Sequence, residues 1–224
     1  MIEFDSTATR RLPVYLLLDT SGSMAGAPIE AVNQGVQLLL TGLKTEPAAL
    51  ETAWLCCLAF DTAPRVVLPL TEIASVTIPP LKTGGVTNLG AAIKFLLGKL
   101  DQDIRTNTPE QKGDYKPLVF IMTDANPTDH GAWEQAVKHL SENTGRRAAS
   151  IIALGCGPSI NAEVLKQLGG VTMVMPDVTP EIIRSFFKWI SQSIKLSSKT
   201  ASQISGAGDL VLNLPPVPSG IQVL

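Results

Sequence analysis

The sequence contains few of the residues that usually mark zinc, redox or disulfide chemistry. It has three cysteines and two histidines, and they form neither a Cys-x-x-Cys pair nor a Cys/His spacing typical of zinc sites. Cys56 and Cys57 are adjacent, so on a strand their side chains would point to opposite faces, and Cys156 stands alone. We therefore expect buried, reduced thiols in a cytoplasmic protein.

Charge of one sign and long apolar runs are equally scarce. The chain has 18 basic and 20 acidic residues, a net charge of −2, and no block of like charge that would favour nucleic acid or an acidic membrane surface. No apolar run reaches the roughly 18 residues of a membrane-spanning helix. The polar start "MIEFDSTATRR" does not resemble a signal peptide. We expect neither nucleic acid nor a membrane as a partner.

What the chain does have is an alternation of apolar strands and amphipathic helices. Residues 14–18 are a continuous apolar run, which is typical of a strand covered on both faces. Further strands are predicted over 53–60, 65–70, 118–122, 149–154 and 171–175, and helices from Pro28 onward and over 89–100, 132–142, 162–168 and 180–196. The predicted fold class is α/β and doubly wound, with a mainly parallel central sheet, one antiparallel edge strand and helices on both faces.

One domain accounts for most of this length. Residues 12–196 are predicted to form it, preceded by an N-terminal extension, 1–11, and followed by a C-terminal tail, 197–224. The tail is rich in Ser, Gly and Pro and contains one apolar alternation, "DLVLNLPP". Two alternatives stay open for it: disorder, or an extended segment packed on this domain or on a partner.

Small oxygen-bearing side chains gather where the predicted strands end. Asp19, Ser21 and Ser23 follow the first strand in "LLLDTSGSM", Thr87 lies in "GGVTNLG", and Asp124 follows a later strand in "FIMTDANPTD". In a doubly wound sheet the carboxyl ends of the strands meet near the switch in strand order. Carboxylate and hydroxyl oxygens suit Mg²⁺, with Mn²⁺ or Ca²⁺ as alternatives, better than zinc. The five side chains therefore predict a metal site, and so few charged ligands would leave the ion open to an anionic ligand.

Each of these residues also has a purely structural interpretation. Ser21 or Ser23 could cap the following helix, and Thr87 another one. Asp129 and His130 could supply a general base, but Asp129 is more simply an N-cap of the next helix. No phosphate-binding loop, dinucleotide-binding fingerprint or serine-hydrolase elbow is present. The metal interpretation is favoured because the five residues occur together along one alternating chain.

The pattern of these residues resembles the metal-ion-dependent adhesion site of the von Willebrand factor A domain. It combines Asp-x-Ser-x-Ser after the first strand, a distant Thr in a Gly-rich loop, and Thr-Asp at the end of a later strand. The quoted segments look most like those of the bacterial TerY-like group, which is associated with tellurite resistance and stress operons. The resemblance assigns Asp19, Ser21, Ser23, Thr87 and Asp124 to the metal. Ala125 departs from the pattern, because the family commonly has Gly after the final Asp, and a left-handed conformation costs Ala more than Gly.

The sequence therefore predicts a non-enzymatic binding module in which a partner's Asp or Glu completes the metal shell. The resemblance implies partners within a bacterial stress or signalling cluster, such as a kinase or a phosphatase of the same gene cluster. The alternative is a Mg²⁺-dependent hydrolase or phosphatase with Asp19 or a metal-bound water as nucleophile. A third hypothesis is an ion with a structural role only.

Overall fold

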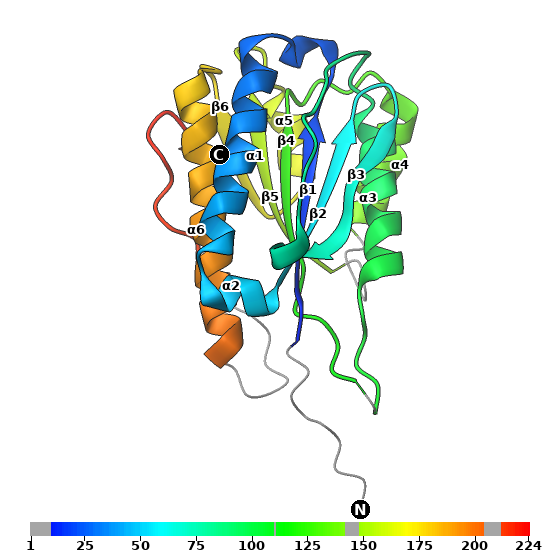
Figure 1. Cartoon of the computed structure of the whole chain (residues 1–224). Coiled ribbons are helices and arrows are strands. Elements are labelled where there is room, and N and C mark those ends of the chain that lie inside the picture. The colour runs from blue at the N-terminus through cyan, green and yellow to red at the C-terminus, as the bar shows by residue number, and fades with distance from the viewer. Residues whose placement is uncertain (1–9, 110, 142–147, 204–211) are drawn as a thin grey trace, which may run out of the picture.

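The computed structural model describes residues 10–109, 111–141, 148–203 and 212–224 (Figure 1). A seven-stranded sheet has the order β3-β2-β1-β4-β5-β6-β7. Its strands are β1 (Leu12–Asp19), β2 (Ala53–Phe60), β3 (Pro64–Glu72), β4 (Leu118–Thr123), β5 (Ser150–Cys156), β6 (Val171–Met175) and β7 (Gln222–Val223). All neighbouring pairs are parallel except β2 with β3 and β6 with β7. The predicted fold class is confirmed, and β7 adds a second antiparallel edge strand.

Helices cover both faces of the sheet, as Figure 1 shows. One layer contains α1 (Ala27–Lys44), α2 (Pro47–Thr52) and α6 (Pro180–Gln203), and the other contains α3 (Leu89–Asp103), α4 (His130–Ser141) and α5 (Ala162–Gln167). Successive side chains of a strand alternate between these layers. Leu16 packs in the α1/α6 layer and Tyr15 in the α3/α4 layer. Cys56 and Cys57 follow the same alternation, and all three cysteines are free and buried, as predicted.

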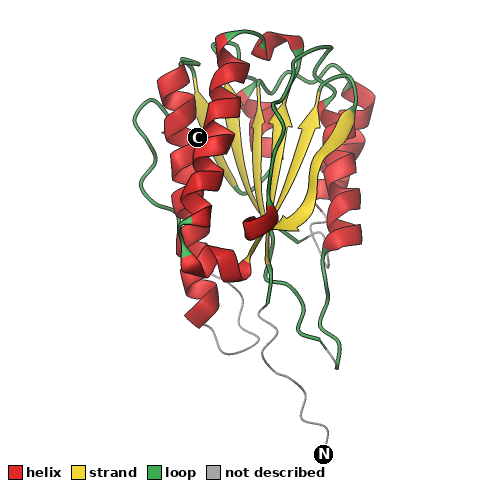
Figure 2. Ribbon diagram, viewed as in Figure 1, coloured by secondary structure: helices red, strands yellow, loops and turns green. Residues whose placement is uncertain are grey.

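The central strands β1 and β4 mark the switch in strand order. From β1 the chain moves outward to β2 and β3, then returns to the other side of β1 as β4. Figure 2 shows the arrowheads of the parallel strands at one common edge of the sheet. Asp19, the last residue of β1, therefore reaches the edge where doubly wound proteins bind ligands.

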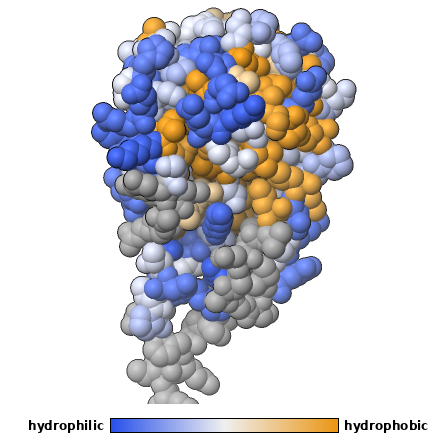
Figure 3. Space-filling view, turned by 180° about the vertical axis from the view of Figure 1, so that it is seen from behind, coloured by the Kyte–Doolittle hydropathy of each residue, from blue (hydrophilic) through white to orange (hydrophobic). Residues whose placement is uncertain are grey.

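The C-terminal segment, residues 212–224, is extended and packs on the domain itself. Ile221 is buried, the backbone N of Leu224 donates to the carbonyl of Thr172, and Trp189 Nε1 donates to the carbonyl of Pro215 at 2.9 Å. Figure 3 shows hydrophobic residues gathered on the side of the molecule that carries this segment. For residues 212–224 of the predicted tail, the packed alternative is therefore correct.

The largest departure from the predicted elements is the length of α6. It continues past residue 196 to Gln203 and so crosses the predicted end of the domain, while the division into extension, domain and tail stays a prediction. The short helix α2 was not predicted. Within the described ranges, none of the helices combines the length and the apolar character needed to cross a membrane.

Candidate metal centre

Asp19 is held in a fixed orientation by bonds to both of its carboxylate oxygens. The backbone N of Ser21 donates to Oδ1 at 2.9 Å, and Thr123 Oγ1 donates to Oδ2 at 2.9 Å. The first bond closes a tight Asx turn at the end of β1, and the second links β1 to the end of β4. Asp19 is only 1% exposed, so this carboxylate is ordered by the sheet itself.

A chain of hydrogen bonds joins the hydroxyls to the second carboxylate. Ser21 Oγ lies 3.0 Å from Ser23 Oγ, and Ser23 Oγ donates to Asp124 Oδ2 at 3.1 Å. In octahedral Mg²⁺ sites with metal–oxygen distances near 2.0–2.1 Å, neighbouring ligand oxygens lie about 2.9 Å apart. The oxygens of Ser21, Ser23 and Asp124 therefore have a spacing that fits such a shell after small adjustments.

Thr87 is brought to the same edge by the loop that precedes α3. The backbone N of Gly22 donates to the carbonyl of Gly85 at 3.1 Å, which fastens this loop to the turn after β1. The carbonyl of Thr87 accepts from the backbone N of Thr128 at 2.9 Å, and Thr87 is 5% exposed. The structure thus joins Ser21, Ser23 and Asp124 through their side chains, ties the carboxylate of Asp19 to the backbone N of Ser21, and holds Thr87 through its backbone.

The helix caps are provided by other residues than the predicted hydroxyls. The N-cap of α1 is Gly26 and that of α3 is Asn88. Ser21 precedes a short 3-10 helix, Gly22–Met24, but makes no side-chain capping bond there. The capping interpretation of Ser21, Ser23 and Thr87 is therefore wrong, and their hydroxyls stay available as ligands.

Asp129 directly precedes α4, as predicted for its N-cap, but its carboxylate serves another helix. Its carboxylate accepts from the backbone N of Gly90 at 3.1 Å and of Ala91 at 2.8 Å, so it stabilises the start of α3 rather than its own helix, α4. Only its carbonyl serves α4, by accepting from the backbone N of Trp133. The prediction missed this because the contact spans 39 positions of the chain, which no local pattern indicates.

Burial disfavours the ionised form of the Asp19 carboxylate. Burial raises the pKa of Asp19 above its ordinary value, hydrogen bonds from Ser21 and Thr123 lower it, and the negative charge of Asp124 raises it further. Burial also raises the pKa of the nearby Cys156 thiol, as do the charges of Asp19 and Asp124. A cation among these groups would offset the carboxylate repulsion.

Ala125 adopts the left-handed conformation for which the resemblance expects glycine. Its φ is 57°, and among the described residues no other non-glycine has a positive φ. Ala125 is fully buried, and its backbone N donates to Thr123 Oγ1 at 3.1 Å. The turn after β4 therefore keeps the shape that directs Asp124 into the cluster, at a cost in backbone strain.

Two supporting residues were not recognised from the sequence. Thr123 orients Asp19, and the hydroxyl directly before Asp124 was the available signal. Arg65 pairs with Asp61 at 2.6 Å and donates to Thr20 Oγ1 at 3.1 Å, beside the turn after β1. Burial alone would raise the pKa of Asp61. The hydrogen bonds from Arg65, the backbone N of Ala63 and Thr20, together with the charge of Arg65, outweigh burial and hold this pKa below its ordinary value.

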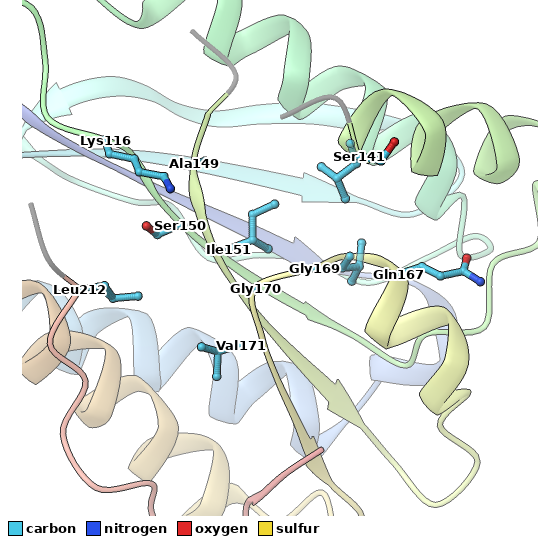
Figure 4. A pocket seen from close by; sticks show the side chains of 12 residues that line it. Lys116, Ser141, Ala149, Ser150, Ile151, Gln167, Gly169, Gly170, Val171 and Leu212 are labelled. Carbon is cyan, nitrogen blue, oxygen red and sulfur yellow. The ribbon is translucent and has the colours of Figure 1, made fainter. Parts of the chain in front are cut away.

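Other parts of the described chain offer no better metal site. Within those residues, no group of three or more His, Cys, Asp or Glu side chains could hold an ion, so a cation here needs the hydroxyls. A pocket of about 480 Å³ lies at the opposite edge of the sheet from the oxygen cluster, where β5 and β6 begin. Figure 4 shows Lys116 and Ser150 at one side of it. Its described lining contains one charged side chain, a cation, so it does not suit a metal.

Comparisons with known proteins agree with this architecture. The sequence matches the model of the von Willebrand factor type A domain over residues 14–179, whereas no functionally curated protein matches it. The structure is similar to a von Willebrand factor type A protein from Catenulispora acidiphila, with 15% identity and a TM-score of 0.60 over 83% of this chain and 43% of that one. It is also similar to the open conformation of the pilus adhesin SpaC from Lactobacillus rhamnosus GG, with 12% identity and a TM-score of 0.61 over 83% and 30%.

An aerotolerance-related membrane protein from Bacteroides fragilis gives 19% identity and a TM-score of 0.52 over 83% of this chain and 99% of that one. The chain spans less than half the length of the first two structures, and at these identities the likeness concerns the fold alone. The family match, in contrast, covers most of the chain, and all five predicted ligands lie within its residues 14–179. The chain therefore belongs to the von Willebrand factor type A domain family, whose domains generally mediate metal-dependent protein interactions.

Proposed function

We propose that this chain is a non-enzymatic, metal-dependent adhesion module. Asp19, Ser21, Ser23, Thr87 and Asp124 would hold a divalent cation, Mg²⁺ before Mn²⁺ or Ca²⁺, and a carboxylate of a protein partner would complete the shell. The observation that carries the proposal is the hydrogen-bonded chain from Asp19 through Ser21 and Ser23 to Asp124 at the switch point.

The composition of the cluster favours an external anion. Two carboxylates and three neutral hydroxyls donate less charge than the carboxylate-rich sites of high-affinity cation buffers. The bound cation supplies an electron-poor coordination position at the molecular surface. Ser23 is exposed and Asp124 is half-buried, so a partner can approach this side of the cluster while Asp19 stays covered.

The kind of partner follows from the resemblance to the TerY-like group. It points to a cytoplasmic protein of a bacterial stress-response system of the tellurite-resistance type. Proteins of the same gene cluster, among them a kinase or a phosphatase, are the proposed partners. Neither nucleic acid nor a membrane is expected, given the balanced charge of the chain.

The two general-base candidates named from the sequence, Asp129 and His130, give the alternative hydrolase little support. Asp129, the nearest sequence candidate, already accepts two backbone N–H groups of α3. His130 lies exposed at the first position of α4. A metal-assisted hydrolase needs a group that moves a proton at the reacting water, and these two side chains do not favour that role.

Affinity capture from a bacterial lysate tests the proposal. The wild-type chain should retain specific proteins in Mg²⁺ and release them in EDTA, and Asp19→Asn should retain none of them. Retention that is unaffected by EDTA and by Asp19→Asn would contradict it. Mg²⁺-dependent turnover of a generic phosphoester, lost in Asp19→Asn, would support the hydrolase instead.

A further inference from the structure

A second pocket of about 310 Å³ opens directly beside the candidate metal centre. Ser23 and Asp124 line both the pocket and the oxygen cluster. Four parts of the chain form its walls: the turn after β1 with the start of α1, the loop after β4, the loop after β5, and Val178 ahead of α6. All four lie at the carboxyl ends of strands, so pocket and cluster share one surface.

The lining of this pocket is mostly apolar. Met24 and Cys156, each 4% exposed, form its buried part. Pro28 and Val178 are half-buried and border it. Among the described lining residues Asp124 carries the only charge, and that charge is negative. An anion such as a phosphate therefore finds no cationic side chain here, whereas an apolar group finds a matching surface.

The walls of the pocket are fixed by hydrogen bonds. Asn126 Nδ2 donates to the carbonyl of Asp124 and to that of Ser159, each at 3.0 Å, and so ties the loop after β4 to the loop after β5. The backbone N of Gly157 donates to the carbonyl of Met175 at 3.0 Å, which fastens the second loop to β6. Because the pocket is preformed, a ligand orders few protein groups on binding.

We propose that this pocket receives an apolar side chain that lies within two residues of the partner's metal-binding Asp or Glu. The inference rests on the proposed function, because the cation fixes where the carboxylate sits. An extended peptide advances about 3.3–3.6 Å per residue, so only near neighbours of the acid can reach a pocket that borders Ser23 and Asp124. The partner motif is thus an acidic residue beside Leu, Ile, Met or Phe.

The pocket is large enough to receive one apolar side chain. Ligand pockets for small molecules range from about 300 to 1,000 Å³, and this one lies at the lower end of that range. Burying one large apolar side chain should strengthen binding about ten- to hundredfold. The carboxylate would supply the cation dependence, and the pocket would choose among acidic partners.

A displayed peptide library tests the inference. Each peptide carries a fixed central Asp or Glu with three random positions on either side, and selection on the wild-type chain is run in Mg²⁺ and in EDTA. Selection in Mg²⁺ should enrich Leu, Ile, Met or Phe within two positions of the acid. Selection in EDTA should enrich no acidic motif.

Two variants locate the preference in the pocket. Val178→Asp should remove the apolar enrichment while cation-dependent retention of acidic peptides remains. The matched control is Val86→Asp, which adds the same charge on the loop before Thr87 at a side chain that is 47% exposed and outside the pocket; it should leave the enrichment unchanged. Val178→Phe, which narrows the pocket without adding charge, should shift the preference toward smaller apolar residues.

The outcomes separate this inference from the proposed function. One outcome is cation-dependent retention of acidic peptides without apolar enrichment; another is equal loss of the enrichment in Val178→Asp and Val86→Asp. Either would show that the pocket does not select an apolar side chain, while the proposed adhesion module would still stand. If no cation-dependent retention occurs at all, the proposed function fails and the inference fails with it.

Discussion

At the scale of single residues, Asp19 carries a buried carboxylate close to the negative charge of Asp124. Without a cation this arrangement opposes folding, because burial penalises the ionised form. We predict that Asp19→Asn unfolds in EDTA at a temperature equal to or above that of the wild type, while the rise in melting temperature on adding Mg²⁺ disappears. Scanning calorimetry with and without Mg²⁺ measures both effects.

The pH dependence of the same pair gives a second readout. Because the pKa of Asp19 is raised in the folded state, the folded state holds the proton over a range where the unfolded chain has lost it. The contribution of Asp19 to the free energy of unfolding in EDTA therefore falls as pH rises from about 4, the ordinary pKa of Asp. The advantage of Asp19→Asn over the wild type should accordingly shrink as pH is lowered toward 4, and an advantage that grows would contradict the account.

Asp129→Asn is the matched control for that prediction. It makes the same chemical change at a carboxylate that caps α3 through Gly90 and Ala91. Loss of one acceptor should lower the free energy of unfolding by about 1 kcal/mol, and the response to Mg²⁺ should remain. If both variants lose the response, the effect comes from general disruption of the edge and not from metal ligation.

Ala125 gives a prediction that concerns backbone strain. A left-handed conformation costs an ordinary residue about 1–2 kcal/mol, while Gly loses about 0.5–1 kcal/mol of entropy and a buried methyl is worth about 0.8 kcal/mol. These contributions nearly cancel, so Ala125→Gly should change the free energy of unfolding little. Ala92→Gly, at a fully buried helical position of α3, should cost about 1–2 kcal/mol. Urea denaturation measures both changes. Equal losses in the free energy of unfolding would contradict the interpretation of Ala125 as a residue under backbone strain.

At the scale of secondary-structure elements, the C-terminal segment behaves as part of the domain. Ile221 is 7% exposed next to the start of β7, whereas Val223 within β7 is 59% exposed. We predict that Ile221→Ala lowers the free energy of unfolding by about 2–4 kcal/mol, while Val223→Ala changes it by less than about 0.5 kcal/mol. Chemical denaturation of both variants checks this, and two equally small effects would mean that the segment adds nothing to stability.

Elements with a strong local pattern could be predicted from the sequence, and those fixed by distant contacts could not. The apolar runs of β2 and β6 gave bounds that match the structure. The two-residue strand β7 has no pattern of its own and exists through its pairing with β6. The last turns of α6 lie in the Ser-rich stretch 197–203, where composition does not indicate helix, although Ser197 and Ser198 are fully buried.

At the scale of the whole molecule, the site follows from topology more than from any one motif. Asp19 and Asp124 lie 105 positions apart in sequence, yet β1 and β4 are neighbours at the switch point. A doubly wound sheet, whose strand ends meet at one edge, could be inferred from the alternating pattern, so the five oxygen ligands could be proposed together. The supporting hydrogen bonds of Thr123, Arg65 and Asp129 could not be predicted, because each joins side chains or backbone groups of different elements that lie far apart in the sequence.

The most direct test of the central claim is to titrate the chain with Mn²⁺ and follow the relaxation rate of water protons. The account predicts saturable binding of a single ion with exchangeable water, and a fall in relaxation enhancement when a Glu-containing peptide takes the open position. Asp19→Asn should show neither effect. Enhancement that is the same in wild type and Asp19→Asn, or that does not respond to the peptide, would contradict a cation held open for a partner's carboxylate.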